Sequence, residues 1–460
     1  MGDTKAPSAP AMAQPYGDYG SVQDADELRL AQMGHKQELK RHFSSWSLIG
    51  LAANCTISWA GLGLGLITSI NAGGPGALIR GFILVFILQC FLATSLAEVV
   101  SAYPTDFVLQ PWMTFVTSQG FNLVTCAIVM FGNRWIPAIN KFSLCYLQLA
   151  WLVILVTVAA AAPKHNDAEF VFETWINETG WTNNVICFIT GLVNPLYSLG
   201  GLDGITHITE EMPNPERDAP LALACTLSIA FVTGSSYLLA LMFSVQDYTS
   251  LADSPTGLPL AEIFRLATQS RGRAFALVFL LWVAVGPCVI GSQLSTGRML
   301  WAFARDGGLP SSGFCSKVNP RYAVPVKAQL CVGIIIALLG CIYLGSSTAF
   351  NLMMNSAIMT INNLAYLMPI LTNLCHGMAV NIVTVAWFIF AILFFSFPYE
   401  MPVTVSNMNY TCVCVGGFLS LELLWWLVAG KKFSKHMQKV ERHDGETAHT
   451  SVVISAGEKS

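Results

Sequence analysis

Long apolar runs recur along the chain, and each is about as long as a helix that crosses a membrane. The hydrocarbon layer is about 30 Å thick, so a helical span needs roughly 20 apolar residues. The runs show no alternation of polar and apolar residues, which disfavours the strands of a transmembrane barrel. Because only helices or closed barrels satisfy their backbone in hydrocarbon, the sequence predicts an all-α, polytopic membrane protein.

The composition agrees with this class of protein. Of 460 residues, 54% are hydrophobic and 11% are charged, whereas about 25% of residues are charged in soluble domains. The net charge of -3 gives no indication of a nucleic-acid partner. The sequence carries no phosphate-binding loop, nucleophile elbow or metal-ligand cluster. We therefore expect neither an enzyme nor an ATP-driven pump, and no cofactor or metal.

Hydropathy predicts about eleven spans within a transmembrane domain of residues 44–430. Residues 1–43 are rich in Ala, Pro, Gly and charge and predict a disordered cytosolic tail, and residues 431–460 predict a second cytosolic tail. The predicted spans are Ser44–Ile70, Ala77–Ala102, Trp112–Phe131, Ile136–Ala161, Asn184–His207, Leu221–Phe243, Ala274–Phe303, Val326–Leu344, Ala349–Leu374, Met378–Phe397 and Tyr410–Val428.

An odd number of spans conflicts with two other features. Basic residues flank both the first span ("HKQELKR") and the last ("KKFSKHMQK"), and basic flanks favour the cytosol. Glycine interrupts the first span ("ISWAGLGLGLITSINAGGPG") and the fifth ("SLGGLDG"), whereas two inverted repeats of five helices would place the second break in the sixth. One helix missing before the fifth span resolves both conflicts.

A helix at that position also determines on which side of the membrane each loop lies. The basic loops "GNRWIPAINK" and "ARDGGLPSSGFCSKVNPRYAVPVK" then lie in the cytosol. Asn177 and Asn409 lie outside, where their sequons become candidate N-glycosylation sites.

Several motifs occur in a characteristic order, and together they resemble one known family. They are "SWAGLGLGLITSINAGGP", "SLAEVVSAYPT", "FGNRWIPAINKFSL", "GGLDGITHITEEMPNPERDAP", "GSQLSTGRMLWAFARDGGLP" and "FFSFPYEMPVTVSNMNYTC". The pattern, from about residue 27 to 432, resembles the fungal amino-acid/choline transporter family of the amino acid–polyamine–organocation superfamily, and choline permeases within it. The resemblance implies twelve spans, an inverted-repeat fold of 5+5 helices with two broken helices, and a multi-pass protein of the plasma membrane with cytosolic termini.

The chain also departs from the family pattern. After "SAYPT" the family continues with a Gly-Gly-Gln-Tyr-aromatic stretch and a third helix, whereas here Thr105 runs into "DFVLQPWM". A shorter loss follows "PILTNL", where "CHGMAVNIVTVAW" begins without the usual basic cytosolic loop. These departures agree with the missing helix that was inferred from the basic flanks and from the symmetry of the two repeats.

The glycine breaks are the candidate substrate site. A broken helix exposes backbone N–H and C=O groups around a cavity, where they can hold a polar substrate. Close packing through small residues is the alternative for each glycine. The candidates are Ser58, Trp59, Ala60, Gly61 and Gly63 in the first break, and Tyr197, Gly200, Gly201, Asp203 and Gly204 in or beside the second.

Aromatic faces and an acid suit a quaternary ammonium, which carries diffuse charge and cannot donate hydrogen bonds. Trp59 and Tyr197 are the aromatic candidates at the breaks, and Trp282 and Tyr366 are weaker ones in later spans. Asp203 is expected to pair with a substrate amine, to carry a coupling proton, or to cap the second half of the broken helix.

Four charged residues and one histidine are candidates for gating and coupling. His207 follows Asp203 by four residues and either joins a proton relay or packs in the core. Glu210 and Glu211 end the fifth span, where the helix dipole disfavours negative charge. We expect them to pair with Arg298 and Arg305 in a gate-like cluster; the alternative is a solvated pair at the membrane surface.

The function that these features predict is secondary active import of a small organic cation, choline first, with H⁺ as the coupling ion. An amino acid, γ-aminobutyrate (GABA) or a polyamine is the alternative substrate, and its carboxylate, where present, would use the backbone N–H groups at Ala60 and Gly61. A non-transporting membrane protein, either a sensor or a defective product of the deletions, is a third possibility. The expected partners are the substrate, H⁺ and the lipid bilayer.

Overall fold

The computed structural model describes most of the chain between its two tails. The described residues are 39, 43–56, 58–102, 115–248, 251, 258–310, 312–345, 362–372, 378–398, 400–404, 408–411, 413, 415–428 and 430. All of them belong to one compact unit, Glu38–Met437. The predicted tails, 1–43 and 431–460, lie outside the described residues except for Leu39 and Phe43, so their boundaries stay predictions.

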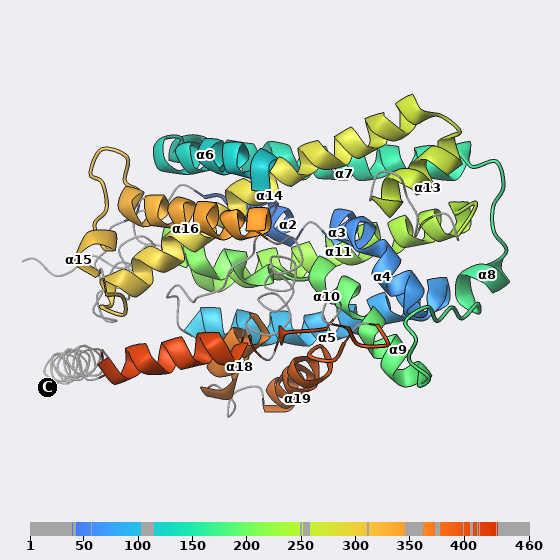
Figure 1. Ribbon diagram of the computed structural model, residues 1–460. Helices are drawn as coiled ribbons and strands as arrows, with labels where there is room; N and C mark the ends of the chain where they lie inside the picture. The colour runs from blue at the N-terminus through green and yellow to red at the C-terminus, as the bar shows by residue number, and fades with distance from the viewer. Residues whose placement is uncertain are drawn as a thin grey trace, which may run out of the picture. The chain divides into compact units, whose positions relative to one another are not determined.

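Every regular element among the described residues is a helix, apart from two isolated β-bridges. A helix satisfies its own backbone hydrogen bonds, which hydrocarbon requires. The elements are α2 (Ser45–Thr56), α3 (Ser58–Leu64), α4 (Leu66–Asn71), α5 (Gly74–Ala102), α6 (Phe115–Phe131), η1 (Asn133–Trp135), α7 (Ile136–Ala161), α8 (Ala168–Phe172), α9 (Asn184–Gly191), α10 (Val193–Ser198), η2 (Leu202–Glu211), α11 (Pro215–Ser244), α13 (Pro259–Thr268), α14 (Arg271–Arg305), α15 (Ser312–Cys315), α16 (Val326–Gly345), α18 (Asn362–Thr372) and α19 (Met378–Phe394), which Figure 1 shows in chain colours.

Among the described residues, five helical stretches are long and apolar enough to cross a membrane, and four shorter apolar helices accompany them. Their outer faces carry large apolar side chains; Phe142, Leu123 and Phe275 are 70–72% exposed. Such a surface suits lipid rather than water, so the predicted polytopic all-α membrane protein is confirmed. The long stretches are Gly74–Ser95, Asn133–Ala161, Asn184–Glu211, Pro215–Ser244 and Arg271–Arg305; the shorter ones are Asn122–Phe131, Val326–Cys341, Met378–Phe394 and Val415–Val428.

The first predicted span, Ser44–Ile70, comprises the helices α2, α3 and α4, and Ile57, between α2 and α3, lies outside the described residues. Gly65 separates α3 from α4. The ninth predicted span, Ala349–Leu374, is described only over α18. The junctions at which the chain departs from the family pattern, after Thr105 and after Leu374, lie outside the described residues.

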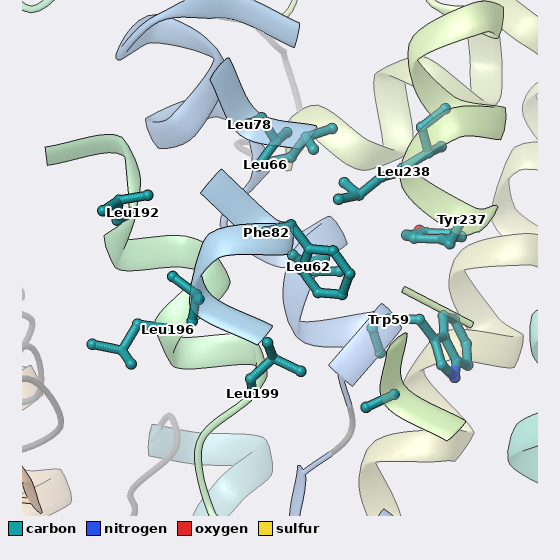
Figure 2. Close-up of a cluster of buried hydrophobic side chains, with 14 of the residues drawn as sticks. Trp59, Leu62, Leu66, Leu78, Phe82, Leu192, Leu196, Leu199, Tyr237 and Leu238 are labelled. Carbon is teal, nitrogen blue, oxygen red and sulfur yellow. The ribbon is translucent and has the colours of Figure 1, made fainter. Parts of the chain in front are cut away.

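Helix α11 packs along α5 and also contacts α2, α3 and α7 (Figure 1). In the apolar cluster of Figure 2, Tyr237 of α11 lies beside Trp59 of α3. This packing anchors the first broken span to a continuous helix. Buried residues of α11 recur every three to four positions, as expected for a buried helix face: Ala222, Leu223, Thr226, Leu227, Ala230, Thr233, Gly234, Tyr237, Leu238 and Leu241.

The loops that carry the two sequons predicted to lie outside contact each other and are called the outer loops below; the structure describes them over residues 173–183 and over 397–398, 400–404 and 408–411. The Met401 N–H donates a hydrogen bond to the Thr179 carbonyl at 2.7 Å. The indole N–H of Trp181 donates to the Pro398 carbonyl at 3.1 Å. The two loops therefore lie on one side of the protein.

The basic loops also meet. The rings of Phe131 and Tyr322 pack edge to face at 5.3 Å, and Asn133 accepts a hydrogen bond from Arg298 at 3.2 Å. The 26 residues of α7 separate this end from the outer loops, a rise of about 39 Å. The loops predicted for opposite sides of the membrane thus gather at opposite ends of the helices; which end faces the cytosol stays a prediction.

Helices α5 and α6 follow one another in the chain and run in the same direction. Helix α5 begins beside an outer loop, where the Gly73 N–H donates to the Ile176 carbonyl at 2.7 Å. Its far part meets the start of α19, where the Ser95 hydroxyl donates to Asn381 at 2.6 Å. Helix α6 ends at Phe131, among the basic loops, so it too runs away from the outer side. Consecutive helices of a membrane protein ordinarily alternate in direction.

Candidate functional site

The second break lies at the glycine sequence predicted within the span Asn184–His207. Helix α10 ends at Ser198, and η2 begins after Gly201, whose φ of +78° lies in the left-handed region that favours glycine. From there to Glu211 the chain forms two stretches of 3-10 helix that meet at a kink at Ile208, whose φ of −125° and ψ of 18° are not helical. A 3-10 helix is tighter than an α-helix and has poorer hydrogen-bond geometry. The break thus changes the backbone conformation at the residues around Asp203.

Glycines bring the two broken spans into direct contact. A Cβ atom at Gly61 would lie 3.2 Å from the Ser198 Cα atom. A Cβ atom at Gly201 would lie 2.8 Å from the Cys55 carbonyl oxygen, and one at Gly204 would lie 2.8 Å from the Cys55 Sγ atom. Close packing through small residues therefore applies to these three glycines, and it places the two breaks side by side.

Asp203 lies in the first turn of η2 and is 6% exposed. Its Oδ1 atom accepts a hydrogen bond from the Tyr366 hydroxyl of α18 at 2.5 Å. Its Oδ2 atom lies 3.0 Å from the Nε2 atom of His207. Gly201 holds the N-cap position, with no side-chain hydrogen bond. The expectation that Asp203 caps this helix is therefore wrong, because its carboxylate binds side chains instead of free backbone N–H groups.

Among the residues that the structure describes, His207 is the one source of positive charge paired with Asp203. Within the described part of the chain no Lys or Arg pairs with this carboxylate, and His207 is charged only when it is protonated. His207 is 1% exposed, and its Nδ1 atom has no hydrogen-bond partner there. A buried ionised carboxylate in a membrane is costly without a compensating charge. The pair can therefore accept one positive charge, either a proton or a cation.

The two aromatic candidates of the later spans, Tyr366 and Trp282, lie in different places in the structure. Tyr366 is buried, and its ring stacks on Phe388 at 5.8 Å beside Asp203. Trp282 is 53% exposed and stacks on Phe279 of the same helix. The structure thus places Tyr366 in the site and Trp282 on the outer surface.

Trp59 lies on α3 and packs edge to face against Tyr237, with ring centroids 5.5 Å apart (Figure 2). It lines a small cavity of about 20 Å³ together with Ser58 and residues of α7 and α11. A single water needs about 10–15 Å³, so this cavity holds one water-sized group.

The remaining candidates of the breaks pack closely. Ala60 is fully buried, and a Cβ atom at Gly63 would lie 2.8 Å from Leu260 and from the Tyr237 hydroxyl. Tyr197 is half-buried on α10, and its ring lies 3.9 Å from the position of a Cβ atom at Gly61. Gly200 precedes the left-handed residue of the second break.

The two glutamates and the two arginines predicted to cluster lie together. The Nε atom of Arg298 donates to Glu211, and the Nη1 atom of Arg305 lies 2.9 Å from the Oε1 atom of Glu210. Arg298 is 0% exposed, and both glutamates are at most 2% exposed. Such burial does not fit the alternative of a solvated surface pair. The ion pairs join the end of η2 to α14.

Neighbouring residues extend this cluster. Arg298 also donates to Asn133 at 3.2 Å. The Nε atom of Arg305 lies 3.5 Å from Asp306, and its guanidinium lies 4.6 Å from the ring centroid of Trp301. The cluster therefore connects the second broken span, α14 and the loop between α6 and α7.

The two predicted glycosylation sites differ in their surroundings. Asn177 is half-buried in an outer loop, and its Nδ2 atom donates one hydrogen bond, to the Trp181 carbonyl at 2.8 Å. Asn409 is 7% exposed, and its Nδ2 atom donates to the Phe395 and Phe397 carbonyls at 2.8 and 2.9 Å. A glycan replaces one hydrogen of this nitrogen, so the geometry favours Asn177.

Sequence reasoning missed Tyr237, Phe388 and Asn133. Tyr237 follows "TGSS" within an apolar run, and a polar ring after small residues in a span is a signal that could have pointed to it. Nothing in the sequence around Phe388 distinguishes it from the neighbouring aromatic residues, and its role follows from its contact with Tyr366.

Comparisons with known proteins agree with the helical membrane architecture. Residues 91–418 match the family model described as "Amino acid permease". A choline transporter of Saccharomyces cerevisiae is 32% identical over 496 residues, covering 92% of this chain and 88% of that protein. A rice (Oryza sativa subsp. japonica) protein, "Amino-acid permease BAT1 homolog", is 28% identical over 516 residues, covering 94% and 98%. The GABA-specific permease of S. cerevisiae is 26% identical over 498 residues, covering 89% and 85%.

These alignments are longer than the chain itself, which has 460 residues. The relatives therefore contain residues opposite gaps in this sequence. The match nonetheless extends over most of the chain and most of each relative. The chain belongs to the amino acid permease family, a family of transmembrane transporters within the amino acid–polyamine–organocation superfamily.

Proposed function

We propose that this chain is a secondary active transporter that imports choline by alternating access, coupled to H⁺, across the plasma membrane, and that both tails lie in the cytosol in the intact family topology. One observation carries the proposal: Asp203, a buried carboxylate beside the second break, has a phenol and an imidazole as its partners and no Lys or Arg among the described residues. A cationic substrate supplies the positive charge that compensates this carboxylate.

The groups around Asp203 suit a quaternary ammonium. Tyr366 binds the acid and stacks on Phe388, while Trp59 lies within α3 and Tyr197 lies at the end of α10, just before the second break. Each aromatic face over a cation contributes about 0.5–2 kcal/mol. The similarity to a protein named choline transporter supports choline as the first substrate to test.

The pair of Asp203 and His207 supports proton coupling. At 3.0 Å, the two side chains can share one proton, and the free Nδ1 atom of His207 offers a second position for it. A proton on this pair and a cation beside Asp203 each neutralise the same carboxylate. Binding of one therefore changes the affinity for the other, which is the linkage that coupled transport needs.

The ion-pair cluster is proposed as a gate. It fixes the end of η2 to α14 through the pairs Glu211–Arg298 and Glu210–Arg305. The cavity beside Trp59, at about 20 Å³, is too small for choline. The helices around the breaks must therefore part for a substrate to enter, and separation of these ion pairs opens one such route.

GABA or another amino acid is the second candidate, which the similarity to the GABA-specific permease favours. Its carboxylate would need the N–H groups at Ala60 and Gly61 and would have to avoid Asp203. A non-transporting protein is the third candidate, because the chain departs from the family pattern after Thr105 and after Leu374.

Competition uptake separates these candidates. Cells that lack their own choline permease express the chain with a surface tag, and labelled choline and labelled GABA are offered with unlabelled competitors. Choline import that unlabelled choline suppresses and GABA leaves unchanged supports the proposal. GABA import without choline import overturns the choice of substrate, and no import by a protein that reaches the surface supports the third candidate.

The same assay on a second version of the chain tests the missing helix. Sequencing the transcript across Thr105 and Asp106 shows whether an apolar span of roughly 20 residues belongs there. If the longer version imports choline and the 460-residue chain does not, the deletion accounts for the loss. If neither does, choline transport itself is excluded.

A further inference from the structure

A group of exposed cations and aromatic rings lies at the end of the helices where the basic loops meet. Arg134 and Trp135 belong to η1, the turn between α6 and α7, and both are exposed. Arg321 and Tyr322 belong to the loop before α16. The ring of Phe131, the last residue of α6, packs edge to face on Tyr322 at 5.3 Å and so joins the two loops. These five residues are called the basic patch below.

The basic patch lies where three apolar helices begin or end. The stretch Asn122–Phe131 ends in it, Asn133–Ala161 begins in it, and Val326–Cys341 begins just after its second loop. Phe131 and Trp135 are 55% and 58% exposed. Aromatic residues concentrate at the boundary between hydrocarbon and headgroups. The patch therefore lies at the level of the lipid headgroups.

The two arginines of the basic patch form no ion pair with a carboxylate in the described part of the chain. The guanidinium of Arg134 lies 5.0 Å from the ring centroid of Trp135. That of Arg321 lies 5.5 Å from the ring centroid of Tyr322. A guanidinium that stacks on a ring can still donate its N–H groups to a phosphate. Two positive charges at this surface are therefore available to an anion.

A further cation continues this surface along α7. Lys141 is exposed and precedes Phe142, which is 72% exposed. Lys141 follows Arg134 by seven residues, which is about two helical turns, so the two lie on the same face. A lysine on a lipid-facing surface extends its ammonium toward the headgroups. The exposed surface thus carries three positive charges in the region where headgroups lie.

An anionic phospholipid matches this surface. Its phosphate accepts paired hydrogen bonds from a guanidinium, and its acyl chains suit the exposed rings of Phe131, Trp135 and Phe142. An acidic protein segment would satisfy the charges, but it would have to cover rings that lie at the boundary of the hydrocarbon. The chemistry therefore favours a lipid of the bilayer over a protein partner.

The turn that carries Arg134 also contacts the ion-pair cluster. Asn133, the residue before Arg134, is 6% exposed and accepts a hydrogen bond from Arg298 at 3.2 Å. Arg298 is the partner of Glu211. Within the three residues of η1, one side chain therefore faces the cluster and the next two face outward. A ligand that holds Arg134 also holds the backbone of the turn from which Asn133 reaches the cluster.

We propose that the basic patch is a binding site for the headgroup of an anionic phospholipid, and that occupation of the site stabilises the ion-pair cluster through Asn133. In the predicted topology this end faces the cytosol, and the cytosolic leaflet carries anionic lipids. The inference goes beyond the proposed function, because it does not depend on which substrate is transported.

The test measures lipid binding by the full chain and needs no transport. Native mass spectrometry in detergent measures the affinity for added phosphatidylserine. R134Q/R321Q should bind it about 30-fold more weakly than the wild type, because each cation near a lipid surface strengthens binding about fivefold. In nanodiscs, phosphatidylserine mixed into phosphatidylcholine should raise the unfolding temperature of the wild type and leave that of R134Q/R321Q unchanged.

R271Q/R273Q is the matched control, because Arg271 and Arg273 are exposed at the opposite end of α14. It removes the same charge and should keep the wild-type affinity. If R134Q/R321Q does not fold, the single variants R134Q and R321Q replace it, each with about a fivefold loss. N133A tests the link to the ion-pair cluster: it should keep the affinity for phosphatidylserine and lose the rise in unfolding temperature.

Three outcomes count against the inference. Binding of phosphatidylserine to the wild type no tighter than that of phosphatidylcholine overturns it. An equal loss of affinity in R271Q/R273Q and R134Q/R321Q means that the lipid is attracted by surface charge in general, without a built site. A rise in unfolding temperature that persists in N133A shows that the lipid does not act through the ion-pair cluster.

Discussion

The phenol of Tyr366 donates a hydrogen bond of 2.5 Å to Asp203, although the two residues are 163 positions apart in the chain. The contact joins α18 to the second broken span and occupies one oxygen of the acid, while His207 occupies the other. The site is therefore assembled from three side chains on two elements, and its net charge depends on a single proton.

Replacement of Asp203 by Asn should abolish choline uptake. The amide keeps the size of the side chain and can still contact Tyr366, but it removes the negative charge that compensates the cation. Labelled choline uptake should fall to the level of cells without the protein, with surface labelling unchanged. D167N is the matched control, because Asp167 is exposed in an outer connection. Uptake by D203N at the wild-type level would show that the charge has no role in transport.

Replacement of His207 by Gln should remove the dependence of uptake on external pH. A proton on the pair and the cation compete for the same carboxylate, so wild-type uptake should fall as the external pH falls from about 7 to about 5. H207Q should give a flat profile. H165Q, at an exposed histidine, should keep the wild-type slope. A flat wild-type profile would rule out H⁺ as the coupling ion.

Removal of one partner of the buried pair Glu211–Arg298 should destabilise the protein. Breaking a buried ion pair leaves an uncompensated charge and costs about 3–5 kcal/mol, so E211Q should lower the unfolding temperature in detergent. E211L/R298M, which removes both charges, should recover most of the loss. E169Q, on an exposed helix, is the control. If E211Q unfolds at the wild-type temperature, the pair does not stabilise this end of α14.

Replacement of Asn177 by Gln should remove N-linked glycan from the protein. Asn177 lies in an outer loop and uses one amide hydrogen, whereas Asn409 uses both. Digestion with an endoglycosidase should therefore shift the wild type and N409Q on a gel and leave N177Q unchanged. A shift that is lost in N409Q instead would assign the glycan to the buried site.

The sequence was sufficient to predict the elements and several contacts. Apolar runs of membrane length predicted the helices, because hydrocarbon leaves the backbone few alternatives. The sequence "SLGGLDG" predicted the break at Gly201, since glycine adopts positive φ freely. The partners of Glu210 and Glu211 followed from charge alone, because buried acids need cations and two arginines lay on the predicted side.

Other features depend on packing between distant segments. Tyr366 contacts Asp203, whereas Trp282 lies on the outer surface. The difference depends on which face of α18 and of α14 points into the protein, and hydropathy does not predict that. The expected cap at Asp203 was wrong because tertiary partners took the carboxylate in place of local N–H groups. The contact of Phe131 with Tyr322, which joins the basic patch, becomes visible only when α6 and the loop before α16 are packed together.

The shared direction of α5 and α6 has a consequence for how a cell places the two ends of this protein. Residues 103–114 connect the helices, and even fully extended they reach about 40 Å. An extended crossing of hydrocarbon would leave every N–H and C=O group without a partner. If residues 103–114 do not cross the membrane, the eleven predicted spans give an odd number of crossings. Tags on the two termini then become accessible from opposite sides of the membrane. A version with one further helix there makes both tags accessible from the cytosol, so a protease-protection experiment on two tags reads the number of crossings directly.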